Sequence, residues 1–267
     1  MLEDVKLSIN VSVDGREAGV GSKQTVKTYN NDTVIMKVAS NVPNGDFHKT
    51  AIIENLIIDG GNNGAIRPGT IGILLKDVYN CIIRNVTIKN CEIGIKIENT
   101  NNYCSESNCI EHIRMSNVKT GILFTAISGN SGDFGFTTIK DVGIKLNNVD
   151  KGNINTDTLE RVGIQIGTAN GPVVKPYSSF IKATIWLSNY GNSCGLKVYG
   201  ELKYSLVMLA VETPEHEDGA KVGMDILTNP SAVSNNQSFM LSYGDNISPV
   251  IKAISPLIGH DIVTEHI

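Results

Sequence analysis

The sequence predicts an all-β protein: a single-stranded right-handed parallel β-helix, a solenoid of about seven to eight coils of about 22 residues, with β caps at both ends. Two observations predict it, namely a short glycine motif that recurs at intervals in the twenties and a composition rich in Gly and Asn. Charged residues make up only 19% of the 267 residues. Because Gly and Asn favour turns over helix interiors, this composition is typical of a turn-rich β protein.

The glycine motif has the form x-Gly-aliphatic-x-aliphatic and occurs seven times. Successive motif glycines are 22, 27, 22, 20, 32 and 28 residues apart. Such a period indicates a solenoid, in which each unit buries its apolar face against its neighbours. Leucine-rich repeats share the period, but their regular leucine frame and helical return segment are absent. The motif glycines are Gly72, Gly94, Gly121, Gly143, Gly163, Gly195 and Gly223.

A second short strand is predicted before each of the first five glycine motifs. In the clearest unit, a third strand is predicted at residues 81–83. Three short strands joined by turns fill about 22 residues and leave no room for a helix. Asn and Gly fall at the strand ends, where corners require left-handed backbone, so stacked Asn ladders are expected there. The second strands are predicted at residues 55–59, 85–89, 112–116, 138–140 and 158–160.

Three segments are predicted along the chain. Residues 1–49 form an N-terminal β cap or the remnant of a longer chain, with strands around Asp14-Gly15 and at residues 34–38. Residues 50–230 form the β-helix, and residues 231–267 form a C-terminal cap or trimerisation strands. Caps are expected because the open end of a β-helix exposes unpaired strand edges.

Residues 53–60 (IENLIIDG) and 82–90 (IIRNVTIKN), followed by the Gly-Ile-x-Ile motif, resemble the coils of the pectate-lyase-like right-handed β-helix superfamily. Bacteriophage tailspikes and tail appendages belong to it, beside pectin-degrading enzymes. The resemblance implies a receptor-binding tail protein in the virion, made in the host cytoplasm. It also implies a homotrimer that contacts other tail proteins and a bacterial surface polysaccharide. The Asp-Gly-x-x-Asp-Asp-Thr entry segment of many phage spikes is missing before residue 50, and no family catalytic residue carries over.

Two alternatives stay open beside the tailspike hypothesis, a polysaccharide lyase or glycoside hydrolase on the same β-helix, and a purely structural virion component. A secreted or cell-surface location is the alternative to the virion. The net charge of −4 gives no basic surplus for nucleic-acid binding. The longest apolar run, residues 206–211, is too short for membrane insertion.

Cysteine placement indicates a reduced protein. Cys81 and Cys91 lie in apolar segments, where buried free thiols are expected. Cys104 and Cys109 lie in a polar loop and could pair with each other.

One outward-facing column is predicted from the alternation within the glycine motifs. Most of its members are not acids, so it offers no stacked carboxylate pair for glycoside hydrolysis. Its leucines favour a subunit interface over a ligand groove. The column comprises Leu74, Lys96, Leu123, Lys145, Gln165, Lys197 and Asp225. On the neighbouring strand, the outward residues are predicted to be Ile57, Thr87, Arg114, Thr138 and Thr158.

Acidic residues gather in the segment before the last glycine motif. They are Glu212, Glu215, Glu217 and Asp218, with His216 among them. Such a loop could bind calcium or supply an acid/base pair, and a solvated turn is the alternative. Together with Glu201, these four acids are the weak catalytic candidates. No cofactor other than this calcium ion, and no other metal site, is predicted.

Aromatic side chains concentrate in one later stretch of the chain. Trp186 falls on an outward position if Ile185 and Leu187 point inward. Sugar binding requires aromatic platforms beside polar groups, so this stretch is the predicted carbohydrate-binding patch, with an intersubunit contact as the alternative. The patch comprises Trp186, Tyr190, Tyr199 and Tyr204.

Overall fold

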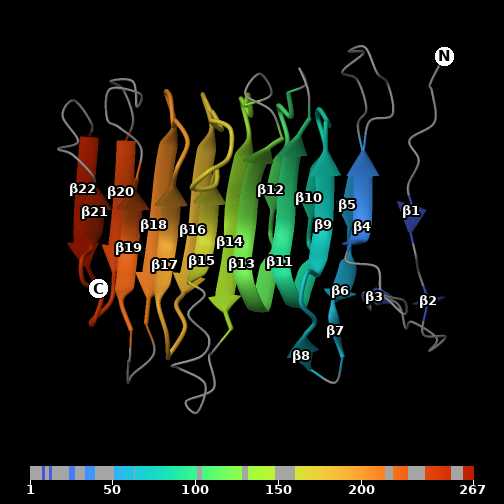
Figure 1. The fold of residues 1–267 in the computed structure, drawn as a ribbon, viewed down its shortest axis with the longest axis horizontal. Helices are drawn as coiled ribbons and strands as arrows, with labels where there is room; N and C mark the ends of the chain where they lie inside the picture. The colour runs from blue at the N-terminus through green and yellow to red at the C-terminus, as the bar shows by residue number, and fades with distance from the viewer. Residues whose placement is uncertain are drawn as a thin grey trace.

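The described part of the computed structural model is all-β, with parallel strands that follow one another along the longest axis in chain order (Figure 1). It contains no helix, and therefore no helix that could cross a membrane. The structure describes residues 8–9, 12–13, 24–27, 34–39, 51–62, 64–100, 104–127, 132–147, 160–213, 219–227, 238–253 and 261–267.

Three ladders of parallel strands make up the fold. The first, which we call the glycine ladder, pairs each strand with the equivalent strand of the next repeat. It contains β4 (Val34–Ala39), β9 (Ile71–Lys76), the C-terminal halves of β11 (Thr87–Asn99) and β13 (Arg114–Ala126), β15 (Arg161–Ile166), β17 (Ser193–Val198), β19 (Lys221–Ile226) and β21 (Ile251–Ala253).

The second ladder, which we call the groove ladder, begins with β3 (Gln24–Lys27), β6 (Leu56–Asp59) and the N-terminal halves of β11 and β13. It continues through the C-terminal halves of β14 (Thr138–Leu146), β16 (Phe180–Trp186), β18 (Leu206–Glu212), β20 (Ser238–Tyr243) and β22 (Asp261–His266).

The third ladder contains β5 (Ile52–Glu54), β10 (Ile82–Arg84), β12 (Cys109–Glu111) and the N-terminal halves of β14, β16, β18, β20 and β22. Three parallel ladders visited in turn by one chain are compatible with a β-helix-like solenoid. Four short strands lie outside this pattern. β1 (Ser8–Ile9) is antiparallel to β4, β2 (Ser12–Val13) is antiparallel to β3, and β7 (Gly61–Asn62) is antiparallel to β8 (Ala65–Ile66).

The interior is formed by aliphatic side chains that stack in register from strand to strand. Ile73, Ile95, Ile122, Ile164 and Leu196 are successive partners on the glycine ladder, and each has 0% exposure. Burying one such side chain stabilises the fold by about 1.5–3 kcal/mol. The alternation predicted from the sequence is therefore confirmed at these positions.

Asparagines stack at the corners between ladders, as predicted. Asn55 and Asn85 both have positive φ, and the Asn85 side-chain amide donates to Asn55 Oδ1 at 2.5 Å. At the next corner the Asn117 amide donates to Asn90 Oδ1 at 2.8 Å, and the Asn90 amide donates to Asp59 Oδ1 at 2.7 Å. Since Asn tolerates left-handed backbone better than most residues, these ladders allow the chain to turn at the same place in successive repeats.

One of the seven motif glycines does not belong to the glycine ladder. Gly143 pairs with Arg114 and Thr184 on the groove ladder, so its motif is not an equivalent repeat. The reason is that β14 runs directly from the third ladder into the groove ladder, and its Gly-Ile-x-Leu pattern matches the motif only locally. The other six, Gly72, Gly94, Gly121, Gly163, Gly195 and Gly223, lie on the glycine ladder or at its strand starts.

The predicted outward column is only partly correct. Leu74 and Leu123 are 7% and 9% exposed, because each lies between ladder partners with long side chains that cover it. Asp225 is also buried, at 4% exposure. Lys145 belongs to the groove ladder, where its partners are Ser116 and Trp186. Lys96, Gln165 and Lys197 do occupy the predicted column, beside Leu74, Leu123 and Asp225.

The strands continue beyond residue 230 in the same parallel ladders. β20 pairs with β18, β21 with β19, and β22 with β20. Near the other end, β4 lies where the sequence predicted a strand, whereas Asp14-Gly15 fall outside the described residues. Of the strand predicted at residues 158–160, only Glu160 is described, and it is not in a strand.

All five cysteines are free thiols, including Cys104 and Cys109. Burial raises the pKa of Cys81 to about 11 and that of Cys91 to about 12. Burial, followed by repulsion from Glu106 and Asp133, raises the pKa of Cys104 to about 11. For Cys81 this lowers the thiolate fraction at pH 8 by about 100-fold.

We therefore expect a thiol reagent at pH 8 to react with the native protein far more slowly than with the protein in denaturant. Counting modified cysteines by mass spectrometry, without added reductant, should give five in the denatured protein. A count of three would show that one disulfide has formed and would contradict the structure, and peptide mapping would show whether it joins Cys104 to Cys109.

Candidate functional site

A groove of about 490 Å³ lies on the outer surface where the groove ladder and the third ladder meet. It is lined by residues of β13, β14, β16, β18 and β20, together with His112, which lies just before β13. We call it the Trp186 groove, because it contains the chain's only tryptophan.

Small side chains form the floor of the groove. Gly143 pairs with Thr184, Thr184 with Ala210, and Ala210 with Ser242. All four line the groove, and all four occupy the same position in successive strands. A row of small residues between rows of larger ones produces a trough that crosses the strands, and so follows the stacking direction of the ladder.

Larger side chains stand on both sides of this floor. On one side Lys182, Met208 and Met240 are successive partners, two residues before the floor positions. On the other side Lys145, Trp186 and Glu212 are successive partners, two residues after them. Because residues two apart on a strand share a face, both rows project on the same side as the floor.

A β-bulge in β14 positions the acidic residue of the groove. Ile139 pairs with Ile181 and Val142 with Ala183, so Lys140 and Asp141 lie opposite the single residue Lys182. Asp141 has a left-handed φ of 52°. A bulge bends its strand and redirects a side chain. In β16, β18, β20 and β22 no residue at this corner has positive φ, so these strands run straight across the position where the earlier repeats turn.

Charged groups gather at the end of the groove nearest β13. The Asp141 carboxylate lies 3.8 Å from His112 Nδ1 and 4.0 Å from Lys182 Nζ. Arg114 Nη1 donates to the backbone carbonyls of Ile113 and Asp141, both at 3.1 Å. Arg114 and Lys182 place two cationic side chains near the Asp141 carboxylate, so this end has an excess of positive charge.

Gly143 lets two large side chains approach each other over the floor. A Cβ at this position would lie 3.2 Å from Arg114 Cδ and 3.3 Å from Trp186 Cζ3. The guanidinium side chain and the indole ring therefore flank the glycine from opposite sides. The indole Nε1 donates to Glu212 Oε2 at 2.8 Å, and Trp186 is 36% exposed. The ring is thus held by a hydrogen bond while remaining open to solvent.

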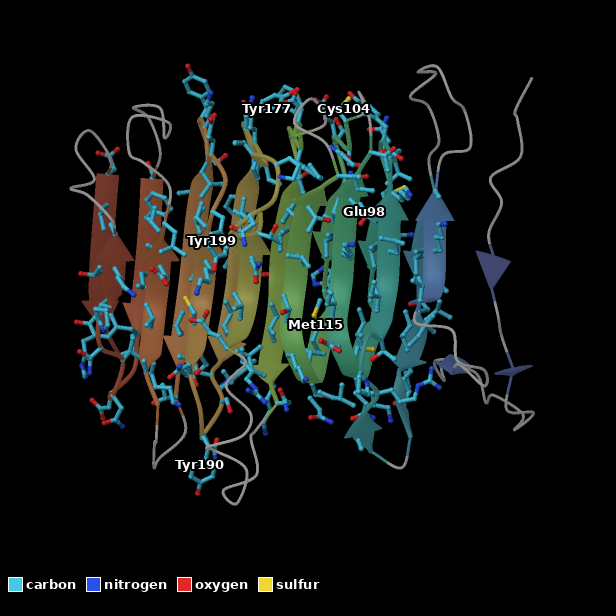
Figure 2. The ribbon with its side chains drawn as sticks, in the orientation of Figure 1. Glu98, Cys104, Met115, Tyr177, Tyr190 and Tyr199 are labelled. Carbon is cyan, nitrogen blue, oxygen red and sulfur yellow. The ribbon has the colours of Figure 1, made fainter. Side chains whose placement is uncertain are left out.

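Of the aromatic residues predicted to bind sugar, only Trp186 lines the groove. Figure 2 shows Tyr190 near the lower ends of the strands and Tyr199 about midway along them. The Tyr199 ring lies 5.6 Å from Lys197 Nζ on the glycine ladder. Tyr204 is 59% exposed at a corner with a φ of 50°. The predicted four-residue patch is therefore not a single surface.

The acidic residues predicted as catalytic candidates do not lie together at one site either. Glu212 belongs to the groove through its bond to Trp186, whereas Glu201 lies 2.9 Å from Lys203 Nζ. Glu215, Glu217 and Asp218 lie outside the described residues, and so does most of the predicted calcium loop. Among the residues that are described, no three His, Cys, Asp or Glu side chains come together as a metal site.

Lys197 lies in an ion cluster within the chain. Its ammonium group donates to Glu160 and lies 3.6 Å from Asp225 Oδ2. Burial of Lys197 disfavours its charged form, but the hydrogen bond to Glu160 and the nearby carboxylate of Asp225 outweigh burial and raise its pKa. Its side chain is only 12% exposed. The position predicted to be an outward contact is therefore largely satisfied by this chain's own carboxylates.

Sequence reasoning missed the other members of the groove. His112, Asp141, Lys182, Met208 and Met240 are far apart in the chain, and only the strand register brings them together. The signal available in the sequence was that Lys182, Met208 and Met240 each occupy an outward position in one of three segments with alternating apolar residues. The sequence did indicate that Trp186 points outward from β16, and this is confirmed.

Comparison with protein-family models, with curated proteins and with solved structures finds no match for this chain.

Proposed function

We propose that this chain is a right-handed parallel β-helix of about seven to eight coils, of the pectate-lyase-like, phage tailspike or tail-appendage type. In this proposal it binds a bacterial surface polysaccharide along the Trp186 groove. The observation that carries the proposal is an exposed indole, held by Glu212, beside a trough of small residues that crosses successive strands.

An indole is suited to sugar binding because the C–H face of a pyranose ring packs on an aromatic ring while the hydroxyls bond to polar neighbours. Glu212, Thr184 and Ser242 supply such neighbours along the groove. Trp186 is oriented by its bond to Glu212 before any ligand arrives, which reduces the entropy lost on binding.

The direction of the groove fits a chain ligand. Its floor crosses β14, β16, β18 and β20, which spans about 14 Å at about 4.8 Å per strand. A hexopyranose unit advances a glycan chain by about one strand spacing. An extended glycan could therefore place successive sugars over successive strands.

Binding accounts for the groove better than glycoside hydrolysis does. The acids that belong to the groove are Asp141, on the side of Lys182, and Glu212, on the side of Trp186. Lys182 and Trp186 are four residues, or about 13 Å of backbone, apart on β16, and the two acids lie on the strands to either side, Asp141 on β14 and Glu212 on β18. Hydrolysis requires two carboxyl groups about 5–9.5 Å apart. Assaying bound polysaccharide for new reducing ends and unsaturated uronates tests the enzymatic alternative.

Trp186→Ala tests the proposal most simply. On an array of bacterial envelope polysaccharides, we expect the native protein to bind at least one glycan and the variant to bind it about 30-fold more weakly, as for a central aromatic contact. Tyr204→Ala, which removes a more exposed aromatic ring outside the groove, is the matched control and should leave binding unchanged. No binding to any envelope polysaccharide, or equal losses in both variants, would refute the proposed site.

We further propose that the protein acts as a homotrimer with other tail proteins. Since Leu74 and Leu123 are buried within the chain, this part of the proposal rests on the family resemblance alone. Light scattering should give a mass near three times 28.8 kDa. A mass of one chain would refute the trimer without affecting the groove.

A further inference from the structure

The Trp186 groove changes character from one end to the other. Its end at β13 and β14 holds His112, Arg114 and Asp141, and Lys182 follows on β16. On the same side of the floor, the next two strands place Met208 and then Met240 at the position of Lys182. The wall thus passes from an ammonium group to two thioethers over three neighbouring strands.

The charged end is suited to one negative charge. Arg114 and Lys182 exceed Asp141 by one positive charge, and Lys182 is well exposed, with a side-chain exposure of 52%. The Arg114 bonds to backbone carbonyls fix the guanidinium side chain over Gly143 without neutralising it. An anionic oxygen arriving here would gain charge-assisted hydrogen bonds from groups already in place.

The other end is suited to a small apolar group. Met240 is 40% exposed. Met208 lies beside it on the next strand, and Ala210 and Ser242 keep the adjacent floor low. Thioether side chains adapt to irregular apolar groups such as a methyl.

We propose that the groove is specific for an acidic glycan in which a carboxylate-bearing sugar is followed by an N-acetylated sugar. The carboxylate binds at Arg114 and Lys182, and the acetamido methyl group of the neighbouring sugar contacts Met208 and Met240, with Trp186 under a ring face. Lys182 and Met208 are partners on neighbouring strands, so the nearest cation and thioether lie about one strand spacing, or about 4.8 Å, apart, which is close to the advance of one sugar unit. This inference rests on the proposed function and adds the chemical class of the ligand.

Four sets of oligosaccharides of equal length test it by calorimetry. One alternates glucuronate with N-acetylglucosamine, one is oligogalacturonate, one is chito-oligosaccharide and one is cello-oligosaccharide. We expect the alternating set to bind about tenfold more tightly than either the acidic or the N-acetylated set, and the neutral set to bind most weakly. Added salt should weaken binding of the alternating set more than that of the chito-oligosaccharides.

Two variants test the carboxylate contact and the acetamido contact separately. Lys182→Gln should weaken the alternating set about tenfold and leave the chito-oligosaccharides unchanged. Met240→Ser should weaken both N-acetylated sets and leave oligogalacturonate unchanged. Lys252→Gln and Ile52→Ser, which alter an exposed lysine and an exposed aliphatic side chain outside the groove, are the controls and should change no affinity.

The outcomes distinguish this inference from the proposed function. Equal binding of the alternating and neutral sets, a Lys182→Gln variant with native preference, or no binding of the alternating set would each overturn the inference. The proposed function is judged separately, by the effect of Trp186→Ala on whichever envelope polysaccharide binds.

Discussion

Gly121→Ala is expected to lower the free energy of unfolding by about 3 kcal/mol or more, because the added methyl group has no room. A Cβ at Gly121 would lie 2.5 Å from the Gly163 carbonyl oxygen and 2.7 Å from Ile144 Cδ1. The first of these atoms is backbone of the next strand in the ladder and cannot move without disturbing the pairing. Urea unfolding followed by circular dichroism measures the change.

Gly143→Ala is the matched control, because both glycines lie in the same sequence motif. Here the new Cβ would meet Arg114 Cδ at 3.2 Å and Trp186 Cζ3 at 3.3 Å. Both atoms belong to side chains at the surface groove that can shift by a few tenths of an ångström. We expect the free energy of unfolding to change by less than about 0.5 kcal/mol. Equal losses in the two variants would show that Gly143 belongs to the glycine ladder after all.

Lys197→Met is expected to lower the free energy of unfolding by about 3 kcal/mol, since it leaves two carboxylates without their shared cation. Asp225 is 4% exposed, and its Oδ1 already has no hydrogen-bond partner among the residues described. Glu160 also loses the bond that it accepts from the ammonium group. The same unfolding assay at neutral pH measures the loss.

Lys252→Met is the control for Lys197, because Lys252 pairs with Asp225 on the other side but is exposed. We expect this variant to differ from the native protein by less than about 0.5 kcal/mol. If instead Lys197→Met kept the stability of the single chain and changed only the mass in light scattering, Lys197 would be a subunit contact rather than part of an internal cluster.

Much of the fold could be predicted from the sequence because its signals are local. Alternating aliphatic residues such as Ile95 and Ile97 need only their own strand to identify the buried face. Asn85 and Asn90 mark corners because their residue type tolerates left-handed backbone. Trp186 was identified as outward by the apolar residues on either side of it. The net charge of −4 for the whole chain argued against nucleic-acid binding.

The predictions that were wrong depend on strand register, which is set by pairing between distant parts of the chain. Gly143 and Gly121 have the same motif, yet one lies on the groove ladder and the other on the glycine ladder. The difference arises because β14 runs from the third ladder directly into the groove ladder, so its Gly-Ile-x-Leu segment matches the motif only in residue type. Because Gly143 was assigned to the glycine ladder, Lys145 was predicted in the wrong column. The neighbours of Trp186 on the groove ladder were not recognised for the same reason. The groove could be recognised only from the strand pairings in the structure.

The central claim is that the Trp186 groove binds glycan, and the fluorescence of the protein tests it most directly. Trp186 is the only tryptophan in the chain, so all tryptophan emission arises from the groove. Titration with any polysaccharide that binds in calorimetry should change the emission saturably, with the same affinity. In Gly143→Leu, whose side chain would occupy the floor, both the heat and the emission change should disappear. Binding heat without a change in emission, or binding that survives Gly143→Leu, would contradict the claim.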